Sequence, residues 1–181
     1  NYNVVVGDEA GTAITTGDDN VAIGYAALDA LSVGSRSVAI GSGALTALTA
    51  TGNTYNTAVG YLAGTAVTTG IRNNFFGAEA GEALTEGTDN IAIGYQTLTA
   101  DTKGSRSVAI GNNALDAQNF TTATDAYNVA IGQAAGSAVT TGVNNTLIGG
   151  LAGDAITTAS SNTALGYQAL TTNTTGANNV A

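Results

Sequence analysis

The chain of 181 residues contains no cysteine, histidine, proline, methionine or tryptophan. Without cysteine it can form neither a disulfide framework nor a thiolate metal site. Without histidine and cysteine it cannot build a serine–histidine or cysteine–histidine catalytic pair, or a zinc site of imidazole and thiolate ligands. We therefore expect a protein that is not an enzyme and that uses no cofactor or metal ion.

Charge is also scarce, since only 9% of the residues are charged and 13 acidic residues outnumber 4 basic ones. A nucleic-acid surface needs clustered lysine and arginine to displace counterions from phosphates, so we expect no nucleic-acid partner. No apolar run approaches the roughly 20 residues of a membrane-spanning helix, so we expect no membrane insertion. The acidic residues do not have the spacing of a calcium-binding loop, and we interpret them as surface charges.

Apolar residues nevertheless make up 44% of the chain, and its mean hydropathy is +0.16. A disordered chain is typically less hydrophobic and more highly charged, so a packed structure is expected. Most of the apolar residues are alanine, which favours thin layers in close contact over a thick globular core.

One repeat accounts for nearly the whole sequence. The stretch Asn-Val-Ala-Ile-Gly-Tyr-Ala-Ala-Leu-Asp-Ala at 20–30 returns in close copies, and each copy contains a glycine that we call the anchor. The anchors are Gly7, Gly24, Gly41, Gly60, Gly77, Gly94, Gly111, Gly132, Gly149 and Gly166. They lie 17 residues apart except where short insertions, around 51–55 and 120–127, lengthen the spacing to 19 and 21. Residues 34–41 recur unchanged as 104–111, which indicates a duplicated block of four repeats.

The columns of this alignment predict the fold. The residue before each anchor is always large and apolar, and we expect it to fill the core: Val6, Ile23, Ile40, Val59, Phe76, Ile93, Ile110, Ile131, Ile148 and Leu165. Alanine dominates the columns three and six residues after the anchor, where close layers leave no room for larger side chains. Thr-Thr-Gly near the end of a repeat indicates a turn.

Glycine and Thr-Thr-Gly interrupt the pattern too often for an amphipathic helix. We therefore predict an all-β fold: a parallel β-solenoid or β-roll of about ten 17-residue coils with a four-coil super-repeat, forming a single domain over 1–181. Coils about 4.8 Å apart give a stack roughly 50 Å long.

Two polar columns precede each strand. The first is asparagine, and we expect it to form a structural ladder of side-chain hydrogen bonds between coils; its members are Asn3, Asn20, Asn56, Asn73, Asn90, Asn128, Asn145, Asn162 and Asn179, with Ser37 and Ser107 as replacements. One residue earlier lies an edge row with charges of alternating sign: Asp19, Arg36, Arg72, Asp89 and Arg106. We expect ion pairs there, each contributing about 0–1 kcal/mol.

Tyrosine follows four of the anchors, at Tyr25, Tyr61, Tyr95 and Tyr167. Two interpretations stay open. The rings pack against the coils, or they line a surface that binds sugars or another copy of the chain.

The segments Ser-Val-Ala-Ile-Gly-Ser-Gly-Ala-Leu-Thr-Ala at 37–47 and Ser-Val-Ala-Ile-Gly-Asn-Asn-Ala-Leu-Asp-Ala at 107–117 resemble the head repeats of trimeric autotransporter adhesins, the YadA-like heads. The resemblance implies parallel β-rolls, packing of three chains about a threefold axis, and an adhesive surface. The segment 162–176 is similar to repeat tracts of phage tail-fibre-like and bacterial surface proteins. This chain has a longer period, of 17 residues, and a four-repeat block.

These observations predict a structural, non-enzymatic segment of an extracellular fibre or surface appendage, located outside the cell, at the cell surface or in a virion fibre. Both ends run in register with the repeat and carry no atypical capping repeat, so we expect self-association as a head-to-tail filament or a homotrimer. The main alternative is an adhesin that binds host matrix or a surface glycan. Ice binding is a lesser alternative.

Overall fold

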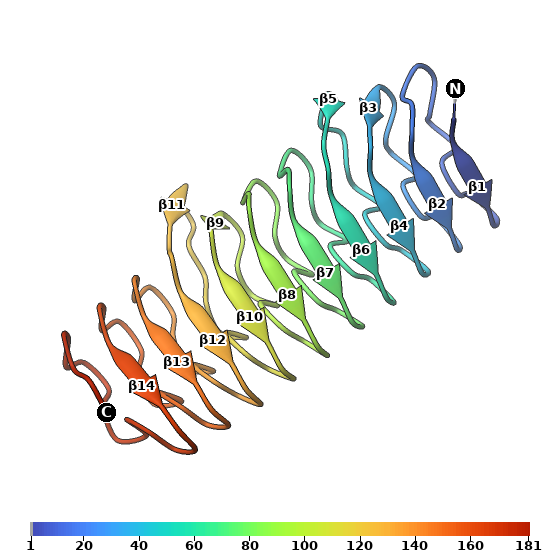
Figure 1. Cartoon of the computed structure of the whole chain (residues 1–181). Helices are drawn as coiled ribbons and strands as arrows, with labels where there is room; N and C mark the ends of the chain where they lie inside the picture. Colours follow the sequence, from blue (N-terminus) through green and yellow to red (C-terminus); the bar gives the residue numbers. More distant parts are fainter. Residues whose placement is uncertain (1) are drawn as a thin grey trace.

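The computed structural model describes residues 2–181 as a stack of coils (Figure 1). The regular elements of residues 2–181 are all β-strands. Ten of them form one sheet: β1 (Val4–Val6), β2 (Val21–Ile23), β4 (Val38–Ile40), β6 (Thr57–Val59), β7 (Asn74–Phe76), β8 (Ile91–Ile93), β10 (Val108–Ile110), β12 (Val129–Ile131), β13 (Thr146–Ile148) and β14 (Thr163–Leu165). The predicted parallel β-solenoid of about ten coils is therefore confirmed.

Each repeat is one full turn of the solenoid, because residues at the same place in successive repeats are paired in register. Val21, Ala22 and Ile23 pair with Val38, Ala39 and Ile40, and every strand pairing is parallel. The two insertions extend the same edge of the stack, where they form two small parallel sheets (Figure 1). In these sheets β3 (Gly34–Ser35) pairs with β5 (Gly52–Asn53), and β9 (Gly104–Ser105) pairs with β11 (Thr124–Asp125).

The anchor glycine makes the bend that ends each strand of the large sheet. Gly24 has φ +130°, and a Cβ there would lie 2.6 Å from the carbonyl carbon and oxygen of Gly41 in the next coil. Only glycine combines this backbone conformation with so close an approach of two main chains. The glycine column is thus required by the spacing of the coils.

Residues with left-handed backbone angles recur two and four positions after the anchor and five positions before it. Ala26 has φ 53°, Leu28 φ 51° and Arg36 φ 64°. The left-handed residues direct backbone N–H groups along the stack in both directions. The N–H of Ala26 donates to the carbonyl oxygen of Asp8 in the previous coil, and the N–H of Leu28 donates to the carbonyl oxygen of Ala44 in the next coil. These bonds hold alanine and leucine in a conformation that both disfavour by about 1–2 kcal/mol.

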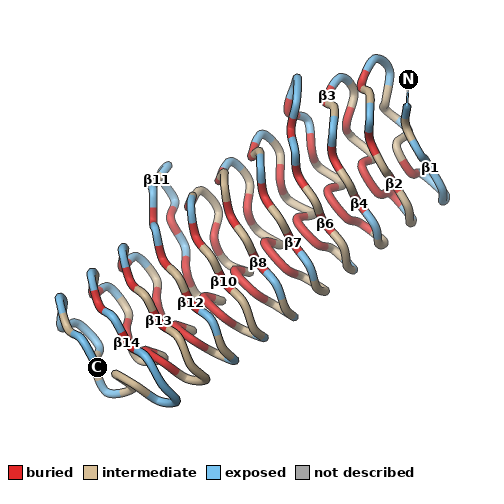
Figure 2. The backbone as a smooth tube through the Cα atoms, in the orientation of Figure 1, coloured by how far each residue is buried: buried red, intermediate tan, exposed pale blue. Residues whose placement is uncertain are grey.

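The prediction that the large residue before each anchor fills the core is wrong. Side chains alternate between the two faces of a strand, and it is the middle residue of each three-residue strand that points inward. The large residue next to it therefore lies on the outer face: Ile40 is 36% exposed, Phe76 40% and Ile93 39%. Figure 2 shows the buried segments following the inside of the stack.

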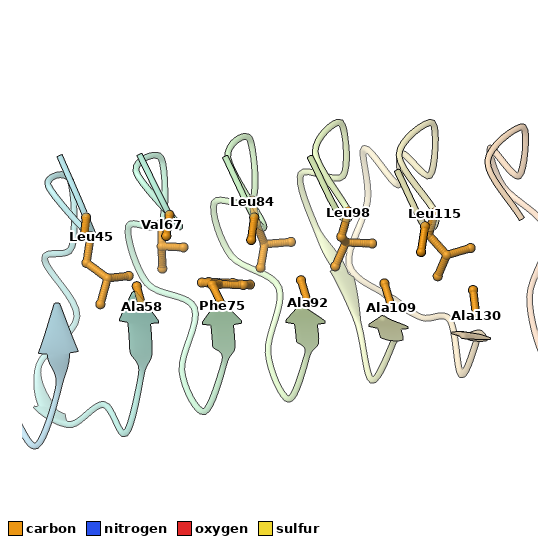
Figure 3. Packing of buried hydrophobic residues seen from close by; sticks show 14 of the residues in the cluster. Leu45, Ala58, Val67, Phe75, Leu84, Ala92, Leu98, Ala109, Leu115 and Ala130 are labelled. Atoms are coloured by element: carbon orange, nitrogen blue, oxygen red, sulfur yellow. The ribbon is translucent and has the colours of Figure 1, made fainter. Parts of the chain in front are cut away.

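The core is filled instead from the wall opposite the sheet. Leucine four residues after the anchor, as in Leu45, Leu98 and Leu115, reaches across to the small strand-centre alanines (Figure 3). A second column seven residues after the anchor adds the buried side chains of Leu31, Leu48, Val67, Leu84, Val139 and Ile156. The alanine column three residues after the anchor is buried as predicted.

The four-coil super-repeat has a packing cause. A large residue stands at the centre of a strand only in every fourth coil, at Val5, Phe75 and Leu147. Phe75 occupies the space beside Gly64 and Gly81, since a Cβ on Gly64 would lie 2.7 Å from its ring. Leu147 lies in the same way between Gly136 and Gly153, where added Cβ atoms would come within 2.7 Å of it. In the coils that have leucine four residues after the anchor, the opposite wall supplies most of the volume.

Candidate functional site

The asparagine column closes each coil and joins it to the next. In the middle of the stack, the Nδ2 group of Asn73 donates to the carbonyl of Gly87, 14 residues further on in the same coil, at 2.9 Å. Its Oδ1 atom accepts from the backbone N–H of Asn90 in the next coil at 3.0 Å and from the Asn90 side-chain amide at 3.1 Å. Asn20, Asn56, Asn73, Asn90, Asn128, Asn145 and Asn162 are fully buried.

The acceptor atom of each asparagine bonds mainly to backbone N–H groups. Oδ1 atoms accept from the N–H of the next coil at 2.9 Å in Asn3, Asn20, Asn56, Asn90 and Asn128. Amide-to-amide bonds occur only at some steps, such as Asn162 to Asn145 at 3.2 Å. The column thus satisfies buried backbone groups at the start of each strand.

Serine replaces asparagine twice, and each serine finds a different partner. Ser37 bonds with the hydroxyl of Thr54 at 2.5 Å. The second block has Ala126 at the place of Thr54, and there the hydroxyl of Ser107 accepts from Nε2 of Gln118 at 3.0 Å. The side chain of Gln118, which stands in the buried column seven residues after the anchors, therefore takes the place of Thr54 as the partner of the serine.

Gln118 belongs to a buried polar cluster that we did not predict from the sequence. The cluster consists of Asp101, Ser107, Gln118 and Asn128, all fully buried. Gln118 donates to Oδ2 of Asp101 at 2.6 Å, and its Oε1 atom accepts from Asn128 at 2.8 Å. Asp101 and Gln118 stand seven residues after their anchors, where the first block has Leu31 and Leu48. That departure from an apolar column was the available sequence signal.

The Asp101 carboxyl group is held by hydrogen bonds but is poorly solvated. Its Oδ1 atom accepts from the N–H of Gly104 and of Phe120, each at 3.0 Å. Burial disfavours the charged form and raises the pKa of Asp101, and the hydrogen bond from Gln118 and the backbone bonds oppose this only in part. The cluster therefore places a titratable group inside the core of the second block.

The edge row contains fewer of the predicted ion pairs than its sequence suggested. Arg72 makes two hydrogen bonds with Asp89, at 2.5 and 2.9 Å, and these bonds lower the pKa of the Asp89 carboxyl. Asp19 lies 3.6 Å from Arg36. Arg106 pairs with Asp125 of the second insertion. These side chains are about half-exposed, apart from that of Asp89 at 30%, so each pair contributes little to stability.

The two insertions supply tyrosines that complete this edge. The guanidinium of Arg36 lies 5.8 Å from the ring centroid of Tyr55 and donates to its hydroxyl at 2.9 Å. The guanidinium of Arg106 lies 5.5 Å from the ring centroid of Tyr127. Both tyrosines occupy the edge-row position of their coils, so the row runs from Asp19 through Arg36, Tyr55, Arg72, Asp89 and Arg106 to Tyr127.

The tyrosine column after the anchors lies at the surface. Tyr25, Tyr61, Tyr95 and Tyr167 are 47–73% exposed. The hydroxyl of Tyr25 has a raised pKa because it bonds to Glu9 and lies near its carboxylate. Half-exposed rings of this kind are available for contact with a sugar or with another protein surface.

The outward side of the large sheet carries one column of apolar side chains along its whole length and a second column that is mostly apolar. The first and last residues of each of the ten strands point outward, and we call the surface that they form the outer face. The last residues are the large apolar residues before the anchors, and the first residues are mostly valine or isoleucine, with Thr57, Asn74, Thr146 and Thr163 as the polar members. No charged residue occurs in either column. Single exposed apolar residues are ordinary, but a continuous apolar strip marks an interaction surface.

The threonines near the turns are bonded along the stack. The hydroxyl groups of Thr68, Thr85, Thr140 and Thr157 each donate to a carbonyl of the next coil at 3.0–3.2 Å. These donors hold adjacent turns together, so these threonines do not present the free hydroxyl donors that an ice-binding face would use.

A shallow recess lies between two adjacent coils, on the wall of the solenoid opposite the edge row. Gln96, Thr99, Ala100, Asn113 and Asp116 line it, and its volume is about 240 Å³. Small-molecule sites typically measure about 300–1,000 Å³, so this recess is smaller than a usual ligand pocket.

Comparison with known proteins finds no match to a family model, to a curated protein or to a solved structure. The part of the chain from residue 2 onward contains no helix that could pass through a bilayer. Function is therefore inferred from the geometry of the stack and its surfaces.

Proposed function

We propose that the chain is a structural, non-enzymatic β-solenoid segment of an extracellular fibre or surface appendage. The observation that carries this proposal is the asparagine column, which forms the same bonds within and between coils from the first coil to the last, except where Ser37 and Ser107 replace it. A chain that repeats the same junction between coils builds a straight stack, and its length and its surface are then the properties that the repeat maintains.

Two further observations support the proposal. Buried side chains such as Phe75, Leu45 and Leu147 and the polar cluster around Asp101 lie inside the stack and hold coils together. The surface recess is smaller than a usual ligand pocket. The extracellular location is supported by the resemblance of residues 37–47 and 107–117 to adhesin head repeats.

Electron microscopy and small-angle X-ray scattering of the purified chain test the structural role. We expect a rigid rod about 50 Å long per chain, from ten coils about 4.8 Å apart. A compact sphere or a flexible chain would contradict it. Immunogold labelling of intact source cells or particles tests the location, and labelling only after permeabilisation would contradict an extracellular site.

The second candidate function is adhesion to a surface glycan or host matrix, favoured by the exposed tyrosine column. Glycan-array binding tests it, with Tyr61→Ala and Tyr95→Ala combined as the variant and Thr122→Ala on the exposed second insertion as the control. An adhesin should show saturable binding that the tyrosine variant loses and the control keeps. Absence of saturable binding by the unmodified chain contradicts this candidate.

A further inference from the structure

We propose that two copies of this chain pack face to face through the outer face, with their solenoid axes antiparallel. This pairing deepens the proposed structural role and rests on it, because it gives the rod its lateral partner. The outer face is the long apolar surface that the fold leaves partly uncovered: in the inner coils Ile40 is 36% exposed, Phe76 40% and Ile93 39%.

The area of the outer face suits a protein partner. Ten strands about 4.8 Å apart and two outward columns about 7 Å apart, with their side chains, cover roughly 48 by 15 Å, or about 700 Å² per copy. Each partner in a stable protein interface contributes about 800 Å². A sugar or a single peptide strand would cover only a small part of this surface.

The regularity of the face favours a second copy as the occupant. Its side chains repeat at the coil spacing along the whole stack, and an identical face has the same spacing. Rows of β-branched side chains can then interdigitate at every coil, as they do between the paired sheets of a steric zipper. A partner without this period would fit a few coils and lose register at the others.

Charges on the edge row select the antiparallel arrangement. When a twofold axis passes between β7 and β8 along the strand direction, the edge rows of the two copies face each other in reverse order. Arg72 then opposes the second copy's Asp89, and each of these charges gains a second opposite charge. In the same register Arg36 opposes the second copy's Tyr127, and Tyr55 opposes the second copy's Arg106. No like charges face each other along this edge.

The tyrosine column agrees with this register. Tyr25 opposes the second copy's Gly150 and Tyr95 opposes the second copy's Ala78, so these two rings meet small residues, while Tyr61 and Tyr167 oppose the polar Asn112 and Asp8 of the second copy. A parallel pair of rods would instead set the tyrosine column of one copy against the edge row of the other. There Tyr61 would meet the second copy's Tyr55, and the contact between Arg72 and Asp89 of different copies would be lost.

Sedimentation velocity of the full chain tests the pairing. We expect a species of twice 17.7 kDa. The double variant Phe76→Lys and Ile93→Lys, which puts charge at the centre of the outer face, should raise the dissociation constant at least 100-fold. The matched control Thr51→Lys and Thr122→Lys adds the same charge on the exposed insertions and should leave the mass unchanged. Circular dichroism verifies that both variants are folded.

Cysteine cross-linking tests the orientation, since the chain contains no cysteine. Antiparallel packing places Ile23 opposite the second copy's Ile148. A short bis-maleimide should therefore link the Ile23→Cys variant to the Ile148→Cys variant in a mixture, and should link neither variant to itself. Self-linking of the Ile23→Cys variant would overturn the antiparallel pairing.

The outcomes separate the two proposals. A rod that sediments as 17.7 kDa at its highest soluble concentration overturns the pairing and leaves the structural role intact. Pairing that survives the two lysines on the outer face also overturns this interface. A chain that is not rod-shaped in scattering overturns the structural role itself.

Discussion

At the anchor position, the space between two coils admits a hydrogen atom but no methyl group. The added Cβ at Gly24 would approach the Gly41 main chain to 2.6 Å, whereas the same atom at Gly166 would meet nothing within 4 Å. Both glycines have φ near +130°. The pair therefore separates the cost of the backbone angle from the cost of the contact.

We predict that Gly24→Ala lowers the free energy of unfolding by about 3 kcal/mol, from the strained angle and the forced separation of coils. Gly166→Ala should cost only the angle, about 1–2 kcal/mol. Urea unfolding followed by circular dichroism measures both. Equal losses in the two variants would show that contact between the coils does not limit this position.

At the scale of the element, a strand in this solenoid is three residues long and stable only through its neighbours. Asn73 supplies an acceptor to the strand that follows and a donor to the turn of its own coil. Removing its amide leaves the N–H of Asn90 and the carbonyl of Gly87 buried without partners, which costs about 1–3 kcal/mol for each group.

We therefore predict that Asn73→Ala lowers the free energy of unfolding by about 3 kcal/mol. Asn3→Ala is the matched control, because Asn3 makes the same two bonds in the partly exposed first coil. Its loss should be less than half as large, since water can replace the missing partner. Hydrogen exchange at the Asn90 amide should speed up in the first variant; unchanged exchange there would contradict the role of the column.

Some coils fill their core with a large residue at the strand centre and glycine on the opposite wall, and others with alanine at the strand centre and leucine on that wall. This alternation gives a second prediction about strand packing. Phe75→Ala should cost about 3–5 kcal/mol, because it empties the space beside two glycines. The double variant Phe75→Ala with Gly81→Leu recreates the pair Ala92 and Leu98 of the next coil and should recover most of that loss.

Gly81→Leu alone is the control for this exchange. With the Phe75 ring in place, a Cβ on Gly81 would lie 2.5 Å from Cδ1 of the ring, so this single variant should be strongly destabilised. Calorimetric unfolding temperatures of the four proteins give the coupling directly. Additive losses in the double variant would mean that the two positions do not share one space.

At the scale of the whole molecule, the buried column seven residues after the anchors is apolar from Leu31 to Leu84, and Asp101 and Gln118 then interrupt it. The raised pKa of Asp101 means that the native chain binds its proton more tightly than the unfolded chain does. The unfolded carboxyl titrates near 3.9. Stability contributed by this group is thus greatest below that pH and falls as the pH rises toward and through the raised native pKa.

We predict that the free energy of unfolding of the native chain falls, relative to the Asp101→Asn variant, as the pH rises above about 4. Asp89 and Asp116 titrate in both proteins, so their contributions cancel in the difference. Urea unfolding of both proteins across this range measures it. A native chain that gains stability over the variant with rising pH would contradict the buried, poorly solvated carboxyl group.

Much of the architecture follows from the repeat itself. An identical spacing with glycine, asparagine and alanine at fixed places predicts stacked coils, because each coil supplies the same bonds to the next. The places of Asn73 and Gly24 in the coil were therefore predictable from one alignment of the chain on itself.

Only the tertiary structure decided which face of each strand points inward. Ala22 and its large neighbour Ile23 are both apolar, so alternation alone permits either choice. The opposite wall settles it: Leu28 reaches across the coil with a left-handed backbone and leaves room only for alanine. The large residues are displaced to the outer face for that reason, and the buried Asp101 likewise depends on partners that lie up to 19 residues away.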